Sequence, residues 1–311
     1  MKILVTGGFG FIGSHIVAEL GRTHHVDILD GFTEDYVGYK YIHRGTKGLQ
    51  ETNEIEKRHR KINLKYRIDK IRGNFKQFYK NNSFEPHIPL TNYDLIINCG
   101  ALSEAILSQH FPDFTYDSIV VGLGRIKKCF PKTPVLHISS SMVYGTWEGV
   151  IDEQYSLGAV DHYGDSKIKA ETLCGEKDVI LRPIHVYGMG DGKFSIWMNI
   201  ERQIAAAKPV MVERAGCIYI DDFVLAIKNI LDNWRPGIYN ISYTFTRNAE
   251  ALTDIYPEPF DVQYKSGPTG KPRGLLSNTK LTETFGIQFS YNNYKETVRD
   301  YYRKYENFCS Q

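Results

Sequence analysis

The sequence predicts an α/β fold: a doubly wound parallel sheet with a smaller C-terminal subdomain. Short apolar runs alternate with helix-length segments through the first two thirds of the chain. These runs lack polar alternation, as expected for strands buried on both faces of a parallel sheet. A glycine-rich turn follows the first run directly, and the alternation fades after about residue 245. Alternation of this kind is typical of doubly wound α/β proteins.

Each element can be assigned in chain order. The expected strands are Lys2–Thr6, Val26–Leu29, Leu95–Cys99, Val135–Ser139, Val179–Leu181 and Gly237–Ile241. The clearest helices between them are Ile12–Gly21, Phe114–Cys129 and Tyr163–Gly175. We expect residues 1–183 and about 218–245 to form the sheet domain. About 184–217 and 246–311 would then form the smaller subdomain.

Composition excludes several classes of protein. The chain has 311 residues, 42% of them apolar and 24% charged, with a net charge of +2, which excludes a disordered or fibrous protein. The near-neutral balance gives no support for nucleic acid or a membrane surface as partner, and no apolar run is long enough for a membrane span. The chain has five cysteines and no Cys-x-x-Cys pair, which argues against a metal site and against a disulfide framework. Free cysteines are typical of a reducing compartment, so we expect a cytoplasmic location.

Residues 31–73 form a segment that is long for a connection between adjacent strands. It contains a basic stretch, EKRHRKINLKYRIDKIRG, with Ile55 and Ile62 seven positions apart. One interpretation is a solvated helix laid on the edge of the domain. The alternative is an oligomer or partner contact, which would be excluded if deletion of residues 45–65 left mass and activity unchanged.

A dinucleotide-binding loop is predicted at the start of the chain. Gly7, Gly10 and Gly13 follow the first strand with the spacing Gly-x-x-Gly-x-x-Gly and open a helix. Such a turn lets backbone N–H groups approach a pyrophosphate, and the helix N-terminus adds positive potential. Asp30 ends the next strand, where its carboxylate would accept hydrogen bonds from ribose hydroxyls and repel a 2′-phosphate. This pattern favours NAD over NADP.

Several further motifs extend this pattern. They are TGGFGFIG at 6–13, SSSMVYG at 139–145, YGDSK at 163–167, LRPIHVYG at 181–188 and YIDD at 219–222. With Asp30, they resemble the extended short-chain dehydrogenases that act on nucleotide sugars, in particular the NAD-dependent epimerase/dehydratase family. The resemblance covers about residues 1–225 and implies a Rossmann-like sheet with a C-terminal substrate-binding subdomain.

The catalytic prediction depends on one tyrosine. Four pairs in this chain have the spacing Tyr-x-x-x-Lys, but only Tyr163 lies 23 residues after a serine cluster that ends a predicted strand. The resemblance implies Tyr163 as acid and base, Lys167 as its activator and ribose anchor, and Ser140 as the hydrogen-bond partner of the reacting oxygen. A nearby ammonium and a positive nicotinamide are expected to lower the phenol pKa from about 10.

By the same resemblance, NAD is the cofactor and a nucleotide-diphosphate sugar the substrate. The residues expected at the cofactor are Gly7, Gly10, Phe11, Ile12, Gly13, Asp30, Asn74, Ala101, Tyr163 and Lys167. The residues expected at the substrate are Ser140, Ser141, His185, Arg214 and Arg273. Asn74 is included because Gly73-Asn74 stands for the family's Gly-Asp pair near the adenine. Either arginine could hold a nucleotide phosphate.

The reaction type is suggested by two residues. Family members that dehydrate the sugar carry an acid pair where this chain has Ser141 and Met142. Epimerisation through a 4-keto intermediate needs no such pair. An NAD(P)H-dependent keto-sugar reductase and a catalytically inactive binder are the alternatives. The resemblance also implies a homodimer, formed through the helices around 113–129 and from Tyr163 onward.

Overall fold

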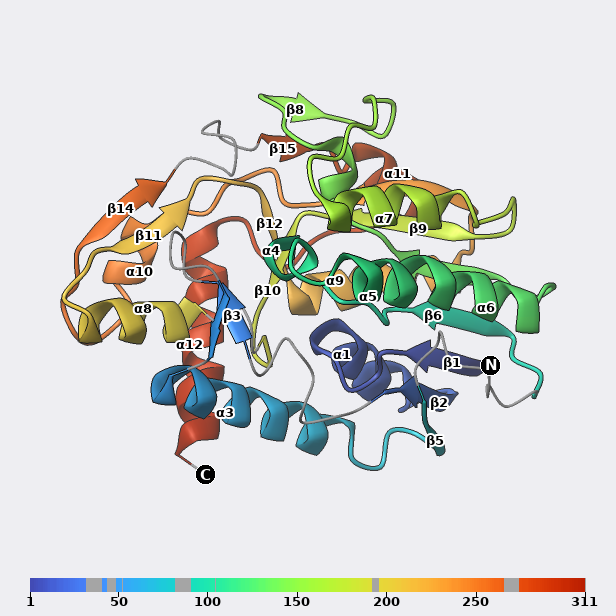
Figure 1. Cartoon of the computed structure of the whole chain (residues 1–311), viewed down its shortest axis with the longest axis horizontal. Coiled ribbons are helices and arrows are strands. Elements are labelled where there is room, and N and C mark those ends of the chain that lie inside the picture. Colours follow the sequence, from blue (N-terminus) through green and yellow to red (C-terminus); the bar gives the residue numbers. More distant parts are fainter. Residues whose placement is uncertain are drawn as a thin grey trace.

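A seven-stranded parallel sheet forms the centre of the molecule (Figure 1). The computed structural model describes residues 1–31, 41–43, 49–51, 53–81, 91–103, 105–191, 196–265 and 274–310. The spatial order of the strands is β13-β9-β7-β6-β1-β2-β5. Their bounds are β1 (Lys2–Thr6), β2 (His25–Asp30), β5 (Gln77–Lys80), β6 (Leu95–Asn98), β7 (Val135–Ile138), β9 (Val179–Pro183) and β13 (Gly237–Ile241). The predicted α/β fold with a parallel sheet is therefore confirmed.

The remaining elements surround this sheet. Four two-stranded pairs are β3 (Tyr41–His43) with β4 (Leu49–Glu51), β8 (Val150–Ile151) with β15 (Leu275–Leu276), β10 (His185–Tyr187) with β12 (Cys217–Tyr219), and β11 (Val210–Glu213) with β14 (Val262–Lys265). The α-helices are α1 (Phe11–Leu20), α3 (Glu54–Ile71), α4 (Ala105–Ser108), α5 (Pro112–Tyr116), α6 (Gly122–Cys129), α7 (His162–Glu171), α8 (Ile196–Ala205), α9 (Ile220–Asp232), α10 (Glu250–Thr253), α11 (Thr279–Phe285) and α12 (Tyr294–Cys309). A π-helical turn, Asp117–Val121, joins α5 to α6, and a 3₁₀ turn, Ser141–Tyr144, follows β7. Among the described residues, no helix is both long and apolar enough to cross a membrane.

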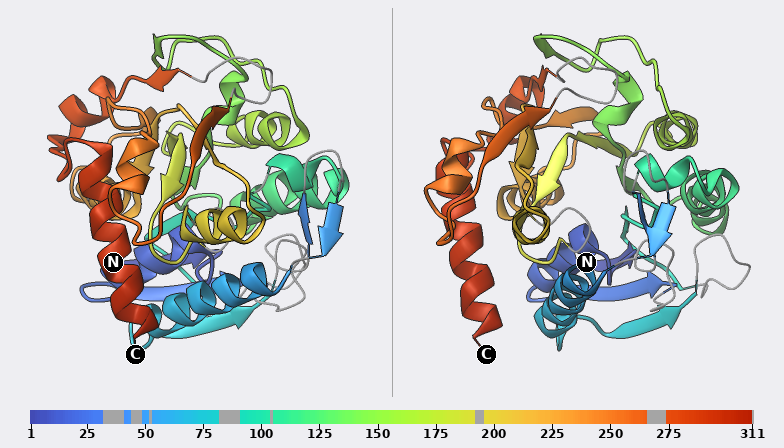
Figure 2. Two further views of the ribbon diagram at one scale, coloured as in Figure 1. Left: turned by 90° about the vertical axis from the view of Figure 1, so that its left-hand side faces the viewer. Right: turned by 60° about the vertical axis from the view of Figure 1, so that its left-hand side comes forward.

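Two apolar cores sandwich the sheet, because successive side chains of a strand point to opposite faces. Ile3 and Val5 of β1 belong to the core that also holds side chains of α1, α9 and α12. Leu4, between them, belongs to the core formed with α6, α7 and the π turn. The helices thus form a layer on each face, as the views of Figure 2 show. Because both faces of each strand are buried in this packing, the strands are continuous apolar runs in the sequence.

The basic segment forms a single helix, α3, but its environment differs from the solvated one expected. Its first turn is closed by a capping box in which Asn53 and Glu56 each accept a hydrogen bond from the other's backbone. Glu56, His59 and Asn63 are buried, whereas Lys57 on the opposite face is exposed. The prediction of a solvated helix is therefore wrong for one face of α3.

The buried face of α3 contacts the C-terminal part of the chain. His59 stacks on Tyr305 of α12 at 5.6 Å between ring centroids, and its Nδ1 lies 3.1 Å from the tyrosine hydroxyl. Glu56 accepts from Arg202 of α8 at 3.4 Å, and Asn63 Oδ1 accepts from Gly190 N at 3.0 Å. The C-terminal end of α12 lies beside α3 in all three views (Figures 1 and 2). The helix thus joins the sheet domain to the elements that follow β9.

Candidate functional site

The direction of the strand order reverses between β1 and β6. The chain proceeds outward from β1 through β2 to β5, and then outward in the other direction from β6 through β7 and β9 to β13. Ligands of such sheets bind at the carboxyl ends of the strands where this order reverses. The glycine loop after β1 and Gly100 after β6 meet at this point: a Cβ on Gly7 would lie 2.8 Å from Gly100 Cα.

The glycine loop has the shape that a pyrophosphate requires. Gly7 has φ +68°, and Gly10 N donates to Gly7 O at 3.0 Å. A Cβ on Gly13 would lie 2.1 Å from that same oxygen, so the helix can approach the loop only without a side chain there. Gly10 precedes α1, and the amides of Phe11, Ile12 and Gly13 form its first turn. These residues fit the diphosphate of a dinucleotide.

Asp30 and Ala101 lie at the same edge of the sheet. Asp30 ends β2, and its carboxylate accepts a hydrogen bond from Phe9 N of the glycine loop at 2.8 Å. Ala101 follows Gly100, whose N–H donates to Thr6 Oγ1 at 3.1 Å. Both residues therefore lie where the sequence places the cofactor, on either side of the glycine loop.

Asn74 lies elsewhere, and its prediction as a cofactor residue is wrong. It precedes β5 rather than following it, and its side chain donates to Lys70 O at 3.2 Å. Its carbonyl oxygen would lie 1.8 Å from a Cβ on Gly21, which ends α1 at the opposite edge of the sheet. Asn81 occupies the carboxyl end of β5 instead, and its N–H donates to Asp30 O at 3.0 Å.

The candidate catalytic residues converge beside β7. Tyr163 and Lys167 lie on the first turns of α7, whose start is capped by the Asp161 side chain accepting from Gly164 N at 2.7 Å. Lys167 Nζ donates to Ile138 O at 2.7 Å and lies 5.7 Å from the centroid of the Tyr163 ring. Ser140 is the second residue after β7, and its side chain is near enough to Tyr163 to lower the pKa of the phenol.

Burial controls the charges of this group. Desolvation raises the pKa of Tyr163 to about 12, and the hydrogen bond with Ser140 offsets only part of that rise. Desolvation lowers the pKa of Lys167 to about 8, against the opposing influence of Cys99 and Glu171. The predicted lowering of the phenol pKa depends on the ammonium and the nicotinamide together, and it stays a prediction for the protein with cofactor bound. A further positive charge is needed to favour the phenolate.

A buried polar network holds the end of β7 in place. Ser139 Oγ donates to Glu171 at 2.5 Å, and Glu171 accepts two further bonds from Arg182, at 3.0 and 2.6 Å. Arg182 also donates to the Tyr144 hydroxyl at 2.8 Å, which in turn donates to Asn240 at 2.8 Å. Ser139 thus has a structural role, whereas Ser140 next to it faces Tyr163. Ser141 is buried in the following turn.

The residues expected at the substrate are more dispersed. His185 of β10 stacks on Tyr187 with ring centroids 6.2 Å apart. Arg214, just after β11, is exposed and lies over the ring of Tyr264 at 3.9 Å. Arg273 lies outside the described residues. The rings that these two side chains contact, Tyr187 and Tyr264, lie outside the group formed by Ser140, Tyr163 and Lys167.

Arg247 is a candidate that the sequence analysis missed. Its backbone N–H donates to Ala215 O at 3.0 Å, which places it beside the position expected of a phosphate-binding arginine. Its guanidinium lies 3.8 Å from Glu213, and its Nε is buried without a partner among the described residues. No motif signals this residue, because it approaches Ala215 from a strand-like segment 32 positions later in the chain.

These features together define a class of protein. A glycine loop without room for side chains lies at the switch point of a parallel sheet, and a Ser–Tyr–Lys set lies at the same carboxyl edge. They are the features of a Rossmann-like protein that binds a dinucleotide.

Comparison with known proteins gives the family. The NAD dependent epimerase/dehydratase family matches residues 3–242, and the chain belongs to this family. An uncharacterized UDP-glucose epimerase of Bacillus subtilis is 28% identical over 251 residues, which are 74% of this chain and 72% of the relative. A UDP-glucose 4-epimerase of Lactobacillus helveticus is 24% identical over 350 residues, covering 96% and 95% of the two chains.

The fold is shared with solved epimerases. The structure of UDP-glucuronic acid 4-epimerase from Bacillus cereus, in complex with NAD, has a TM-score of 0.78 and covers 99% of each chain at 19% identity. At this identity the likeness establishes the fold, and the Rossmann-like prediction is confirmed.

Proposed function

We propose that this protein is an NAD-dependent epimerase of a nucleotide-diphosphate sugar, and that UDP-sugars are the first substrates to test. The observation that carries the proposal is the convergence of Ser140, Tyr163 and Lys167 at the carboxyl edge of β7. Family membership and the names of the relatives support it.

Each residue has a distinct task in this proposal. The Tyr163 phenolate takes the proton of the sugar hydroxyl and, then a phenol, later returns it, while Ser140 Oγ hydrogen-bonds the same sugar oxygen. Lys167 keeps a positive charge beside the phenol, and its bond to Ile138 O fixes its position. The glycine loop and Asp30 would hold NAD, which when bound supplies the hydride acceptor and donor. Its positive charge also opposes the desolvation that raises the Tyr163 pKa.

The surroundings of Tyr163 favour epimerisation over dehydration. Met142 is buried and packs in the same apolar cluster as Tyr163. Dehydration needs an acid and a base to expel a hydroxyl from a neighbouring carbon, and Met142 and Ser141 supply neither. A redox-neutral inversion requires only the residues already present. We infer that Ser141, His185, Arg214, Arg247 and Arg273 contact the nucleotide sugar.

Proton NMR of UDP-sugars incubated with the pure protein tests the proposal. We expect inversion at one sugar carbon without net consumption of NADH or NADPH. Conversion of 4-keto sugars alone, with stoichiometric loss of reduced cofactor, would make the protein a reductase and overturn the proposal.

A tyrosine variant tests the catalytic assignment. Tyr163→Phe should lower turnover by roughly 10²–10⁴ and leave NAD binding intact, because the lost hydroxyl moves a proton while the glycine loop, Asp30 and Lys167 still hold the dinucleotide. Tyr291→Phe is a matched control: Tyr291 belongs to another Tyr-x-x-x-Lys pair, and its hydroxyl donates to Asp300, 3.0 Å away. Equal turnover of the two variants would refute the role of Tyr163.

A further inference from the structure

A cleft unrelated to the candidate active site opens between α1, α3 and α9. Its volume is about 220 Å³. It is lined by residues of α1 and the turn after it, by the last turn of α3 and by α9. The glycine loop lies at the other end of α1, so the cleft is separate from the proposed NAD site.

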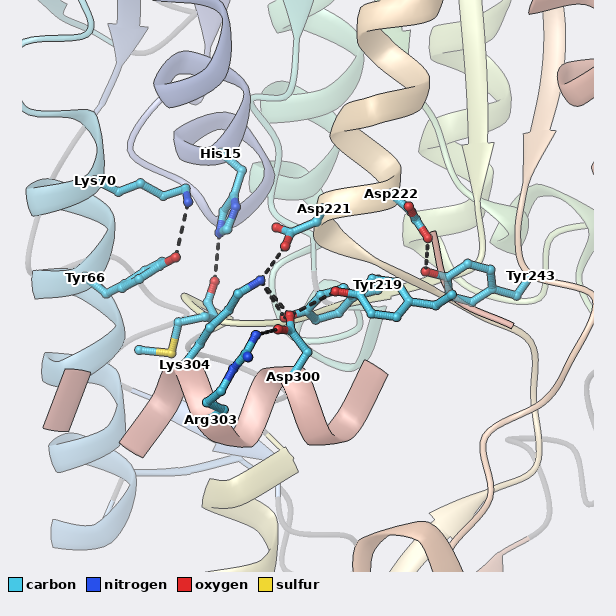
Figure 3. Close-up of polar contacts among 12 residues, drawn as sticks. His15, Tyr66, Lys70, Tyr219, Asp221, Asp222, Tyr243, Asp300, Arg303 and Lys304 are labelled. Carbon is cyan, nitrogen blue, oxygen red and sulfur yellow. Dashed lines mark hydrogen bonds and ion pairs between the residues drawn. The ribbon is translucent and has the colours of Figure 1, made fainter. Parts of the chain in front are cut away.

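The cleft is rich in charge. Its charged lining residues are the cations Arg22, Lys70 and Lys228 and the carboxylates Glu19 and Asp221. Ala18, Val224 and Leu225 provide apolar walls. His15 also lines it and is neutral: burial and the nearby Lys70 hold its pKa well below the usual range. Its ring nitrogen Nε2 faces Met189 O at 2.8 Å (Figure 3).

Both carboxylates of the cleft are already engaged by cations. Glu19 accepts from Lys228 at 2.6 Å and from Arg22 at 3.0 Å. Asp221 accepts from Lys304 of α12 at 2.5 Å, and the same ammonium lies 2.6 Å from Asp300 (Figure 3). Positive charge in the lining therefore exceeds what these two carboxylates can offset.

Lys70 is the cation of the cleft that neither carboxylate neutralises. Its ammonium donates to the Tyr66 hydroxyl at 3.2 Å and, within the described part of the chain, forms no ion pair (Figure 3). Desolvation lowers its pKa, Asp221 and Glu19 oppose that shift, and the neighbouring Lys304 and Arg22 add to it. A half-buried ammonium whose hydrogen-bond partner is neutral carries a desolvation cost, and an anion within hydrogen-bonding distance would reduce that cost.

We propose that this cleft binds a small phosphate group, either as inorganic phosphate or as the phosphate of a small monoester. Arg22, Lys70 and Lys228 come from three different elements, α1's C-terminal end, α3 and α9. A tetrahedral oxyanion presents acceptors in several directions and can meet cations that approach from several sides. The double negative charge of a phosphate can neutralise more than one of these cations. A bound phosphate would also join α3 to α1 and α9, and so stabilise the fold.

The test is thermal unfolding of the full chain in increasing inorganic phosphate, with sodium chloride keeping ionic strength constant. We expect a saturable rise in Tm, and Lys70→Met should weaken phosphate binding about tenfold or more, as expected for a lost charge-assisted hydrogen bond. Lys57→Met, which removes an exposed lysine of the same helix, should bind phosphate as the wild type does. Glycerol phosphate in place of inorganic phosphate shows which source binds more tightly.

Two outcomes would overturn the proposal. One is the absence of any rise in Tm beyond that of chloride. The other is an equal rise in Lys70→Met, which would place the anion elsewhere, for example in the candidate active site. The variant itself should fold, because it removes a half-buried ammonium that has no carboxylate partner among the described residues.

Discussion

Asp30 is the residue that we expect to select the dinucleotide. Its carboxylate is fixed by the bond from Phe9 N at the end of β2. A 2′-phosphate at this point would meet a like charge, so NAD(H) should bind at least about tenfold more tightly than NADP(H). Fluorescence titration of both cofactors measures the ratio. Asp30→Asn should reduce this ratio of dissociation constants. Asp69→Asn, near the C-terminal end of α3, should leave the ratio unchanged. Equal dissociation constants of the wild type for NAD(H) and NADP(H) would contradict the prediction.

Lys167 should make stability depend on pH. Its ammonium is enclosed, and burial lowers its pKa from 10.5 to about 8. Below pH 8 both the folded and the unfolded protein hold this proton, and the fold carries a cost of roughly 3 kcal/mol. Between pH 8 and 10.5 the folded protein has released the proton while the unfolded chain retains it. The cost therefore disappears, and stability rises with pH through this window.

Urea unfolding of cofactor-free protein can isolate this effect. The free energy of unfolding of Lys167→Met minus that of wild type should fall by roughly 3 kcal/mol between pH 7 and 10.5. Taking the difference cancels the contributions that the other titrating groups make to the free energy of unfolding. Lys169→Met, which removes an exposed ammonium from the same helix, should give a flat difference from pH 7 to 10. A flat difference for Lys167→Met as well would show that its ammonium is not desolvated.

At the scale of elements, α3 should act as a structural bridge. The Asn63 side chain accepts from Gly190 N and donates to His59 O at 2.9 Å, and all of these contacts are buried. Asn63→Ala leaves a buried N–H without an acceptor, which should lower the free energy of unfolding by about 1–3 kcal/mol. Urea denaturation measures it, with Lys61→Ala on the exposed face as the control. A loss below about 0.5 kcal/mol for Asn63→Ala would contradict the bridging role.

The strands were more predictable from the sequence than α3 or the edge of the sheet. The six apolar runs match six strands to within two residues at each end, because burial on both faces demands continuous apolar sequence. β5 was not predicted: Gln77 and Lys80 are exposed and, among the described strands, β5 pairs only with β2 at the end of the sheet. Because β5 was not predicted, Gly73-Asn74 was expected near the adenine, whereas the structure places Asn74 before β5.

The buried face of α3 could not be read from the sequence either. Its residues are polar, and polar residues at helical spacing normally indicate a solvated face. Their partners, such as Tyr305 and Arg202, are more than 140 positions away in the chain. The proposed catalytic set was easier to find, because Ser140, Tyr163 and Lys167 lie within 28 positions on adjacent elements.

At the scale of the whole molecule, we propose the division drawn from the sequence, with residues 1–183 and about 218–245 as the sheet domain. The parts are closely joined. Ile3 of β1, Ile218 of β12 and Tyr301 of α12 belong to one apolar core. Helix α3 adds buried polar contacts from the sheet domain to α8 and α12. The proposed substrate residues beyond β9 are therefore held against the proposed NAD site by packing as well as by chain connectivity.

The face of α5, α6 and α7 should form a homodimer. Tyr116 on α5 and Leu173 just after α7 are 42% and 38% exposed, and Gly124 of α6 lies against Leu173. Pairing this face with that of a second copy would bury these side chains in a bundle of helices from both subunits, a favourable use of exposed apolar surface.

Sedimentation velocity at micromolar concentration should therefore show twice the chain mass. Changing Tyr116 and Leu173 together to Glu should give a folded monomer, because both side chains are exposed in the single chain and two buried charges would oppose pairing. Leu157→Glu provides the control, since Leu157 is 43% exposed but lies outside the three helices. A wild-type monomer, or a double variant that remains dimeric, would show that this face is not the interface.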